Sequence, residues 1–256
     1  MVGIHKAGVA LGRPTFVTND VLMPNSLCLL DEQAARHMRV LRLEVGQAVA
    51  LRDGAGGVAE GQLVRLTKAQ AQIELRAVGH CYPPPPVHLL IPVADKDRML
   101  WLAEKASELA CTSWRPVMWR RSRSVSPRGE GMSFQTRVRS RMQSALAQSE
   151  GAWLPQLFPE ANVERALLAA PEGDRVVLDP LGTPLVGPGA MMLRAPLTLA
   201  IGPEGGIEPD EMMSLERAGF RRASIGPTIL RFETAAIAAL AMARTSLADP
   251  PQLPQA

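Results

Sequence analysis

Four consecutive prolines at residues 83–86 place the strongest constraint on the fold of this chain of 256 residues. Proline has no backbone N–H and a fixed φ, so such a run cannot continue a helix or a central strand and favours an extended spacer. A chain of this length has room for one or two domains. We therefore expect a domain junction at the prolines, with one domain at residues 1–82 and a second at residues 83–256.

The sequence before the prolines has the pattern of a small β domain. A short apolar run ends in the Asp53-Gly54 turn, and residues 58–66 and 71–78 alternate loosely in the manner of half-buried strands. Only one helix is indicated, at residues 31–38, with acidic residues in its first turn. Short strands with closely spaced turn signals predict a small β-barrel.

After the prolines, strands and helices alternate. Strands are expected at residues 87–93, 115–119, 175–178 and 197–201, and helices at residues 99–110 and 135–148. Continuous apolar runs such as residues 87–93 suit parallel strands that are covered on both faces. The pattern predicts an α/β domain with a mainly parallel sheet.

Two turns that contain glycine lie close together in residues 197–231. The apolar run 197–201 ends in GPEGG at residues 202–206, ahead of a helix with Pro209 near its first position, and a second apolar stretch ends in Ile225-Gly226-Pro227. We expect the two bends side by side at the carboxyl ends of neighbouring strands, where open α/β sheets bind ligands. Glycine there lets a flat ligand approach the main chain, because no Cβ stands in the way.

These turns would form a pocket made mostly of main chain. Apolar walls would come from Ala200, Ile201, Ile229 and Leu230, and polar groups from Glu204, Arg231, Glu233 and Thr234. Because no lysine accompanies the glycines, such a site suits an adenine-containing cofactor better than a free phosphate. From the residues alone, a purely structural pair of turns is an equally good interpretation.

The usual catalytic motifs are absent. The sequence has no GxSxG, HExxH or GxxxxGKS/T and no GxGxxG after a strand, and its four histidines are scattered. The three cysteines lack a CxxC pair, which indicates free thiols and no metal site. No apolar run reaches the ~18–20 residues that a membrane span needs. The first residues lack the long apolar region of a secretory signal, so a cytoplasmic location is expected.

The net charge of +3 is modest, but arginines are concentrated in one stretch. It contains Arg120, Arg121, Arg123, Arg128, Arg137, Arg139 and Arg141, opposed only by Glu130. One interpretation is a solvated loop. The other, favoured because arginine holds phosphate through two donors at once, is a surface that contacts a polyanion. A basic stretch alone does not distinguish RNA from other polyanions.

Several strings resemble the bacterial 16S ribosomal RNA (uridine-N3)-methyltransferase family of the SPOUT superfamily. The most specific are IGPEGG at residues 201–206 and IGPTILRFETA at residues 225–235. Residues 37–43 with Gly46, then Asp53-Gly54 and Gly56, resemble the N-terminal PUA-like barrel of the family; Lys96 and residues 105–109 resemble its first catalytic-domain helix; Gln148-Ser149 with Pro155 resemble its QS…P segment. The similarity runs in the right order through nearly the whole chain.

The resemblance implies an RNA-binding PUA-like barrel at residues 1–82 and a SPOUT methyltransferase domain at residues 83–256. A trefoil knot at about residues 176–245 would hold S-adenosylmethionine, one of the rare exceptions to unknotted folds. The implied substrate is N3 of a uridine in the 16S rRNA of the small ribosomal subunit, and the active form is a homodimer. The residues expected at the cofactor are Leu178, Ile201, Gly202, Pro203, Glu204, Gly205, Gly206, Ile225, Gly226, Ile229, Leu230, Thr234 and Ala235.

The chemistry of uridine then suggests roles. N3 carries a proton between two carbonyl groups, so it is a poor nucleophile until that proton leaves. Arg231 would favour the anionic base and is the expected catalytic residue. Glu233 would orient Arg231 or relay the proton, although a charge matched to the helix dipole explains it equally well. The residues expected to contact RNA are Arg13, Arg36, Arg39, Arg42, Arg120, Arg121 and Arg123.

Two positions depart from the family pattern. The family usually has an arginine shortly after the QS pair, where this chain has Gly151, and a second one where Thr228 stands. Both would touch RNA or the dimer partner, so two alternatives remain: a related ribose 2′-O-methyltransferase, and an RNA-binding ribosome-assembly factor that has lost methyl transfer. The PUA-like barrel argues against the first, and the retained residues 231–234 argue against the second.

Overall fold

The computed structural model describes residues 13–122 and 129–247, which fold as two compact units. The N-terminal unit runs to Pro83 and also includes Gln143–Leu154. The C-terminal unit holds Pro84–Met142 and the residues from Pro155 onward. The sequence offers no sign that residues 143–154, which lie well beyond the prolines, group with the N-terminal unit.

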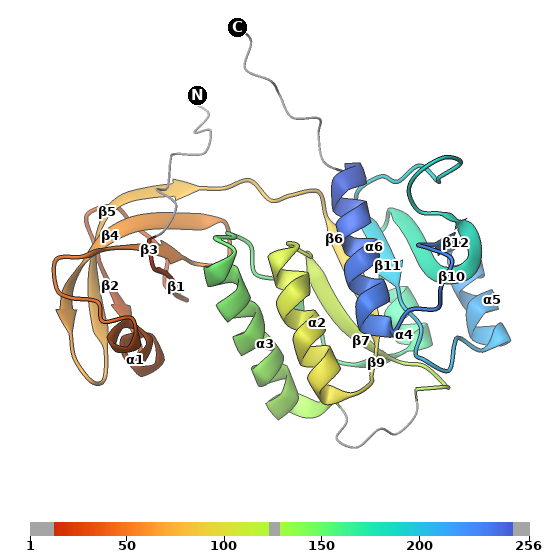
Figure 1. Cartoon of the computed structure of the whole chain (residues 1–256), viewed down its shortest axis with the longest axis horizontal. Helices are drawn as coiled ribbons and strands as arrows, with labels where there is room; N and C mark the ends of the chain where they lie inside the picture. The colour runs from red at the N-terminus through yellow and green to blue at the C-terminus, as the bar shows by residue number, and fades with distance from the viewer. Residues whose placement is uncertain (1–12, 123–128, 248–256) are drawn as a thin grey trace, which may run out of the picture. The chain divides into compact units, whose positions relative to one another are not determined.

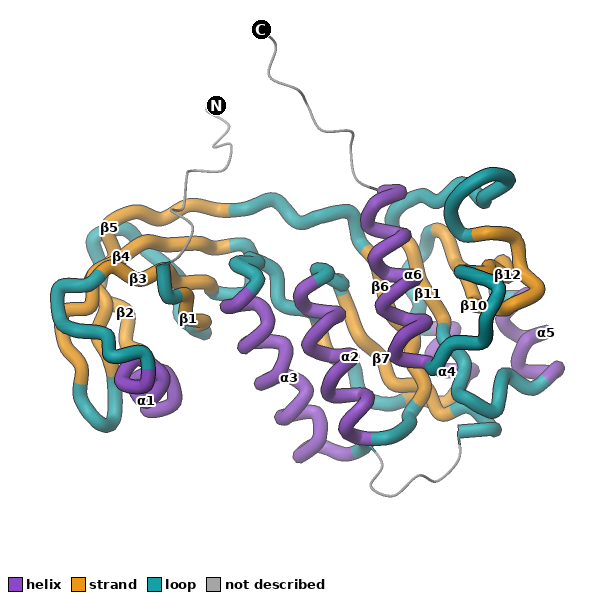
Figure 2. Tube along the Cα trace, viewed as in Figure 1, coloured by secondary structure: helices purple, strands orange, loops and turns teal. Residues whose placement is uncertain are grey.

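The N-terminal unit is built on a five-stranded sheet with the order β1-β3-β4-β5-β2 (Figures 1 and 2). Its strands are β1 (Thr15–Val17), β2 (Leu27–Leu30), β3 (Ala48–Arg52), β4 (Gly57–Leu66) and β5 (Ala71–His80). β1 and β3 run parallel, and the other pairs run antiparallel. The sequence predicts β3, β4 and β5 but not β1 and β2, whose three and four residues are too few for alternation to show.

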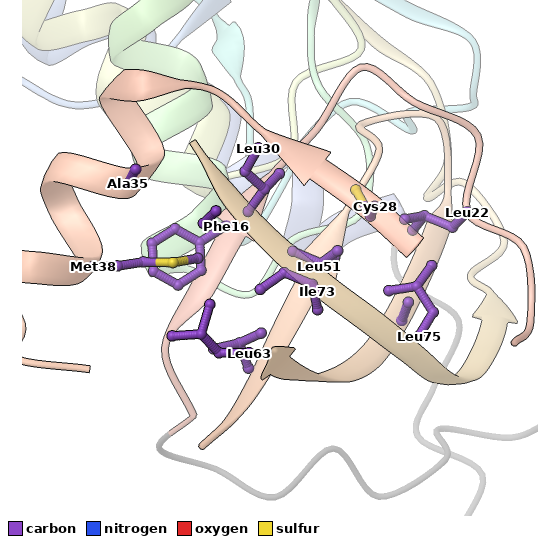
Figure 3. Close-up of a cluster of buried hydrophobic side chains, with 13 residues drawn as sticks. Phe16, Leu22, Cys28, Leu30, Ala35, Met38, Leu51, Leu63, Ile73 and Leu75 are labelled. Carbon is purple, nitrogen blue, oxygen red and sulfur yellow. The ribbon is translucent and has the colours of Figure 1, made fainter. Parts of the chain in front are cut away.

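One hydrophobic core holds this sheet and helix α1 (Glu32–Val40) together. The helix begins where predicted, because the Asp31 carboxylate accepts a hydrogen bond from Ala34 N–H at 2.9 Å. Its fully buried Ala35 and Met38 face Phe16 and strand residues such as Leu51 (Figure 3). The opposite face of the helix carries its charged residues.

Residues 143–154 join this unit through the turn between β3 and β4. Gly56 N–H donates to Ala152 O at 2.9 Å. The Trp153 ring meets His80 edge-on, with 5.7 Å between the ring centroids. A Cβ on Gly56 would lie 2.5 Å from both rings, so this close approach requires glycine.

The C-terminal unit contains a seven-stranded sheet in which every pair of strands is parallel. The order is β12-β10-β11-β6-β7-β8, and β9 also pairs with β7. The strands are β6 (Val87–Pro92), β7 (Ser113–Met118), β8 (Gln156–Leu157), β9 (Ala161–Asn162), β10 (Asp174–Pro184), β11 (Leu197–Ala200) and β12 (Arg221–Ser224). The predicted α/β class with a mainly parallel sheet is confirmed.

Helices cover both faces of this sheet. They are α2 (Lys96–Glu108), α3 (Gly131–Gln148), α4 (Val163–Leu168), α5 (Pro209–Arg217) and α6 (Phe232–Leu247). α2 and α6 pack together over one face (Figure 1), and α4 and α5 cover a core on the other that includes Leu90 and Val177. None of the described helices is long and apolar enough to cross a membrane.

The strand order corrects one expectation about the two glycine turns. β11 and β12, which precede these turns, are not neighbours, because β10 lies between them. Chain order hides this, since β10 comes before both. All three strands are parallel, so their carboxyl ends still meet at one edge of the sheet.

Arg244 ties the last helix to the beginning of the C-terminal unit. Its Nε donates to Leu109 O at 3.0 Å, and its two other nitrogens donate to the backbone carbonyls of Pro85 and Ala110. Burial lowers the pKa of this guanidinium from its ordinary value. One side chain on α6 thereby satisfies backbone groups of the proline spacer and of the residues that follow α2.

Candidate cofactor site

A pocket of about 610 Å³ opens at the edge where β10, β11 and β12 end. It is lined by residues 178–180, 201–207, 223–226 and 228–232, with Met212 and Ala235. Leu178 and Thr183 of β10 both pair with Ala223, so residues 179–182 bulge out of the sheet. The bulge widens this edge, and the volume is that of a site for a small molecule or cofactor.

The first turn, residues 202–206, has a conformation that depends on its glycines. Gly206 N–H donates to Pro203 O at 2.8 Å, and Gly206 has a φ of +77°, in the left-handed region that favours glycine. A Cβ on Gly202 would lie 2.7 Å from Ile207 Cγ1. α5 then begins at Pro209, as predicted.

Side chains from outside the first turn hold it in place. Arg98 of α2 places Nη1 3.3 Å from Glu204 Oε1. Arg121, which follows β7, donates from Nη1 to Gly205 O at 3.0 Å and from Nε to Glu208 Oε1 at 2.6 Å. The turn is therefore fixed by groups from two other elements of the same unit.

The second turn, residues 225–231, is open by comparison. Ile229 is 89% exposed, and Arg231 is exposed at the rim of the pocket. Across residues 13–122 and 129–247, no side-chain hydrogen bond or ion pair involves any residue of this turn. The Arg231 guanidinium is thus available to a ligand.

Glu233 lies at the start of α6, behind the pocket lining. Its side chain is only 9% exposed, and its Oε1 is 3.8 Å from Arg98 Nε. Its Oε2 is buried without a hydrogen-bond partner in the part of the chain that the structure describes. The ion-pair partner of Glu233 is therefore Arg98 and not Arg231, which the sequence suggested. Nothing in the sequence around Arg98 marks it as a residue of the site.

Every residue expected at the cofactor lines the pocket except Thr234. Thr234 is exposed, because it points away from the side of α6 on which Phe232 and Ala235 line the pocket. Ala200, expected as an apolar wall, is fully buried in the core beneath α4 and α5 instead. The sequence missed Asp179, a pocket residue whose carboxylate accepts from Leu181 N–H at 2.8 Å.

The N-terminal arginines expected at RNA are mostly engaged within their own unit. Arg13, Arg36 and Arg39 contact Glu60, Glu32 and the carbonyl of Thr67, at 2.6, 3.1 and 2.5 Å respectively. Arg42 is exposed. Arg36 and Arg39 are also exposed residues.

The arginine stretch is less open than its composition suggests. Arg120 pairs with Asp210 and Arg121 with Glu208, both at the beginning of α5. Arg137 and Arg139 are exposed on α3, and Arg141 lies 3.6 Å from Glu104. Arg123 and Arg128 lie outside the described residues.

The thiols and acidic side chains do not gather into a metal-binding arrangement among the described residues. Cys28 and Cys111 are buried and Cys81 is exposed, and all three are free. Burial raises the pKa of the Cys111 thiol to about 12, so it stays protonated at neutral pH.

Comparison with known proteins decides the family. The RNA methyltransferase domain family matches residues 82–244, and the RNA methyltransferase PUA domain family matches residues 30–76. The chain belongs to the RNA methyltransferase family. The predicted enzyme class and the predicted PUA-like N-terminal domain are thereby confirmed.

Similar proteins agree with this assignment. The ribosomal RNA small subunit methyltransferase E of Synechocystis sp. is 29% identical over 230 residues, covering 88% of this chain and 75% of its own length. The protein of the same name from Mycobacterium bovis is 30% identical over 212 residues, covering 78% and 79%.

Solved structures of the family show the same fold. The ribosomal RNA small subunit methyltransferase E of Neisseria gonorrhoeae, crystallised with S-adenosyl methionine, superposes with a TM-score of 0.82 at 26% identity, over 91% of this chain and 97% of that one. A Legionella pneumophila protein described as a methyltransferase has the same fold, with a TM-score of 0.78 at 24% identity over 91% of this chain and 97% of that one.

Proposed function

We propose that this protein transfers the methyl group of S-adenosylmethionine to N3 of a uridine in the 16S rRNA of the small ribosomal subunit. The observation that carries the proposal is the pocket at the ends of β10, β11 and β12, because both signature turns of a chain in the RNA methyltransferase family line it. The substrate would place the protein in the cytoplasm, where ribosomal subunits are assembled.

The pocket fits an adenosine-containing cofactor. Gly202, Gly205 and Gly206 expose main chain to it, and a Cβ at Gly202 would crowd Ile207. Exposed main-chain N–H and C=O groups can bind the edge of a purine ring, and Ile201 and Leu230 supply apolar walls. When bound, S-adenosylmethionine supplies an electrophilic methyl group on a sulfonium, so the protein mainly has to position the two reactants.

We assign Arg231 to contact with the uracil of the target nucleotide. Its guanidinium is unpaired among the described residues and stands at the rim of the pocket. A cation beside the uracil carbonyl oxygens favours loss of the N3 proton and stabilises the negative charge that results. N3 lies on the pairing edge, so the target uridine must be unpaired or extruded before transfer.

We assign Glu233 to the transfer of the proton that leaves uridine N3. A buried carboxylate oxygen without a hydrogen bond costs about 1–3 kcal/mol, so Oε2 has a strong reason to accept a proton or a donor from the reacting complex. The other oxygen, Oε1, lies 3.8 Å from Arg98 Nε, an ion pair that favours the charged carboxylate. In this assignment Glu233 relays the N3 proton and does not orient Arg231.

RNA and a second copy of the chain complete the proposed assembly. Arg36, Arg39 and Arg42 lie on one helix and its C-terminal end in the N-terminal unit, where they would contact phosphates. The homodimer is part of the proposal because the family resemblance implies it. The trefoil knot at about residues 176–245 is part of the proposal, supported by the position of β10 between β11 and β12.

The test uses labelled S-adenosylmethionine and small ribosomal subunits from a strain that lacks the modification. Incorporation into 16S rRNA is expected, at one uridine whose pairing edge is blocked to reverse transcriptase. Free 16S rRNA is the parallel substrate, and the Arg231→Ala variant is the negative control. A methyl group on a ribose would support the 2′-O-methyltransferase alternative. Cofactor binding without any incorporation would support an assembly factor that has lost transfer.

A further inference from the structure

Arg121 has an unusual set of contacts for an exposed arginine. Its Nε and Nη2 bind the two oxygens of the Glu208 carboxylate at 2.6 and 3.1 Å. Its remaining nitrogen, Nη1, donates to Gly205 O at 3.0 Å. One planar group thus joins the start of α5 to the main chain of the turn that lines the pocket.

The geometry of these bonds makes Arg121 a brace rather than an isolated surface charge. A carboxylate that takes two donors of the fork fixes the plane of the guanidinium, so the third donor has a defined direction. Arg121 also packs closely against the turn, because a Cβ on Gly205 would lie 3.2 Å from Arg121 Cβ and 3.4 Å from Arg121 O. Arg121 therefore both bonds to the Gly205 carbonyl and lies close against Gly205.

The adjacent Arg120 provides a natural comparison. It also pairs with an acid of the same helix, Asp210, but both side chains are more than half exposed and its guanidinium makes no contact with the turn. The two arginines share charge, sequence position and type of partner. They differ in that Arg121 alone bonds to Gly205 O.

We infer that Arg121 is a positioning residue for the cofactor turn, residues 202–206, and not one of the RNA contacts expected from the arginine-rich sequence. It holds the Gly205 carbonyl so that the turn is already shaped for the cofactor before binding. A preformed site loses less conformational entropy on binding and therefore binds more tightly. This inference rests on the proposed role of the turn in binding S-adenosylmethionine.

The experiment measures S-adenosylmethionine binding by calorimetry for the full chain and the variants Arg121→Gln and Arg120→Gln. Arg121→Gln is expected to raise Kd about tenfold, which corresponds to about 1.4 kcal/mol. Arg120→Gln is expected to stay within about twofold, since exposed ion pairs contribute little. Binding of a 16S rRNA fragment is measured in parallel, and the two variants should affect it equally.

A double-mutant cycle with Glu208→Gln adds a readout that a general loss of stability would not produce. If Glu208 acts by holding the fork of Arg121, the effects of Arg121→Gln and Glu208→Gln on cofactor Kd will not add. Thermal unfolding checks that each variant is folded. If Arg121→Gln is not, Arg121→Lys replaces it: lysine keeps the charge but lacks the fork, so an intermediate increase in Kd is expected.

Three results would overturn the inference. Unchanged cofactor Kd in Arg121→Gln would remove it while leaving the proposed function intact. Weaker RNA binding in Arg121→Gln than in Arg120→Gln, with equal cofactor Kd, would make Arg121 an RNA contact. Absence of cofactor binding by the unaltered protein would overturn the proposed cofactor, and this inference with it.

Discussion

The two turns at the pocket differ in how they are held. Residues 202–206 are restrained by Arg98 on Glu204, by Arg121 on Gly205 O and by an internal bond from Gly206 to Pro203. Residues 225–231 have no such side-chain restraint among the described residues. We call residues 202–206 the rigid wall of the pocket and residues 225–231 its responsive wall. A rigid wall suits a ligand that is always the same, and a responsive wall suits an RNA that must be deformed before it reacts.

The difference follows from where acids stand in the two strings. The first turn and the start of α5 contain Glu204, Glu208 and Asp210, each of which pairs with an arginine from elsewhere in the unit. The second turn, IGPTILR, contains no acid at all. Its only charged residue, Arg231, is therefore left for the substrate.

The largest effect is expected from the responsive wall, which contains Arg231. Arg231→Ala should lower kcat about 10²–10³-fold, because it removes a donor aimed at charge that develops in the transition state. Cofactor Kd should stay within about twofold, since the rigid wall is unchanged. Single-turnover methylation and calorimetry separate the two quantities. Normal turnover would show that the open turn has no catalytic role.

The next effect tests whether the two acids that pair with Arg98 have different roles, Glu233 in the chemistry and Glu204 in cofactor binding. Glu233→Gln should lower kcat about 10²-fold with little change in cofactor Kd, because general acid–base groups contribute at least that much. Glu204→Gln, the matched change at the other acid of Arg98, should instead act mainly on Kd. If both variants change kcat and cofactor Kd by similar factors, the two acids do not have different roles.

A smaller effect is expected from the rigid wall itself. Gly202→Ala places a methyl group 2.7 Å from Ile207 Cγ1, and overpacking of this kind costs about 1–3 kcal/mol. Cofactor Kd should rise about tenfold or more, given about 1.4 kcal/mol per factor of ten. The double variant Gly202→Ala/Ile207→Ala removes the clash and should recover part of the affinity. Wild-type affinity in Gly202→Ala would show that residues 202–206 can shift to accommodate the methyl group.

The smallest effect is expected at Thr234. The sequence placed it at the cofactor, but it is exposed and does not line the pocket. Thr234→Ala should change kcat and cofactor Kd by less than about twofold, as most surface substitutions do. A larger change in cofactor Kd or in kcat would show that Thr234, in the first turn of α6, takes part in the site.

Local patterns account for what the sequence predicts correctly. The alternation in β4 and β5 and the strand-turn-helix pattern around Gly202 are both read within a few residues. The family resemblance then adds the cofactor and the substrate. The two turns that line the pocket are predicted, because both are continuous strings, whereas lining residues outside them, such as Asp179, Met212 and Ala223, are not.

Pairing between distant residues accounts for what the sequence does not predict. Arg121 and Glu208 are 87 positions apart, and Arg98 and Glu204 are 106 apart. Neither pair leaves a local pattern, so the sequence alone predicts Arg121 as an RNA contact and gives no sign of Arg98. The same holds for the place of β10 between two later strands and for the return of residues 143–154 to the N-terminal unit.

The bonds of Arg244 have a consequence for synthesis of the protein. Pro85 and Arg244 are 159 positions apart. A ribosome that adds ~5–20 residues per second needs roughly 8–30 s to cover that distance. During this interval the carbonyl of Pro85 lacks its Arg244 donor. The carbonyls that Arg244 bonds to therefore gain these donors only after α6 has been synthesised.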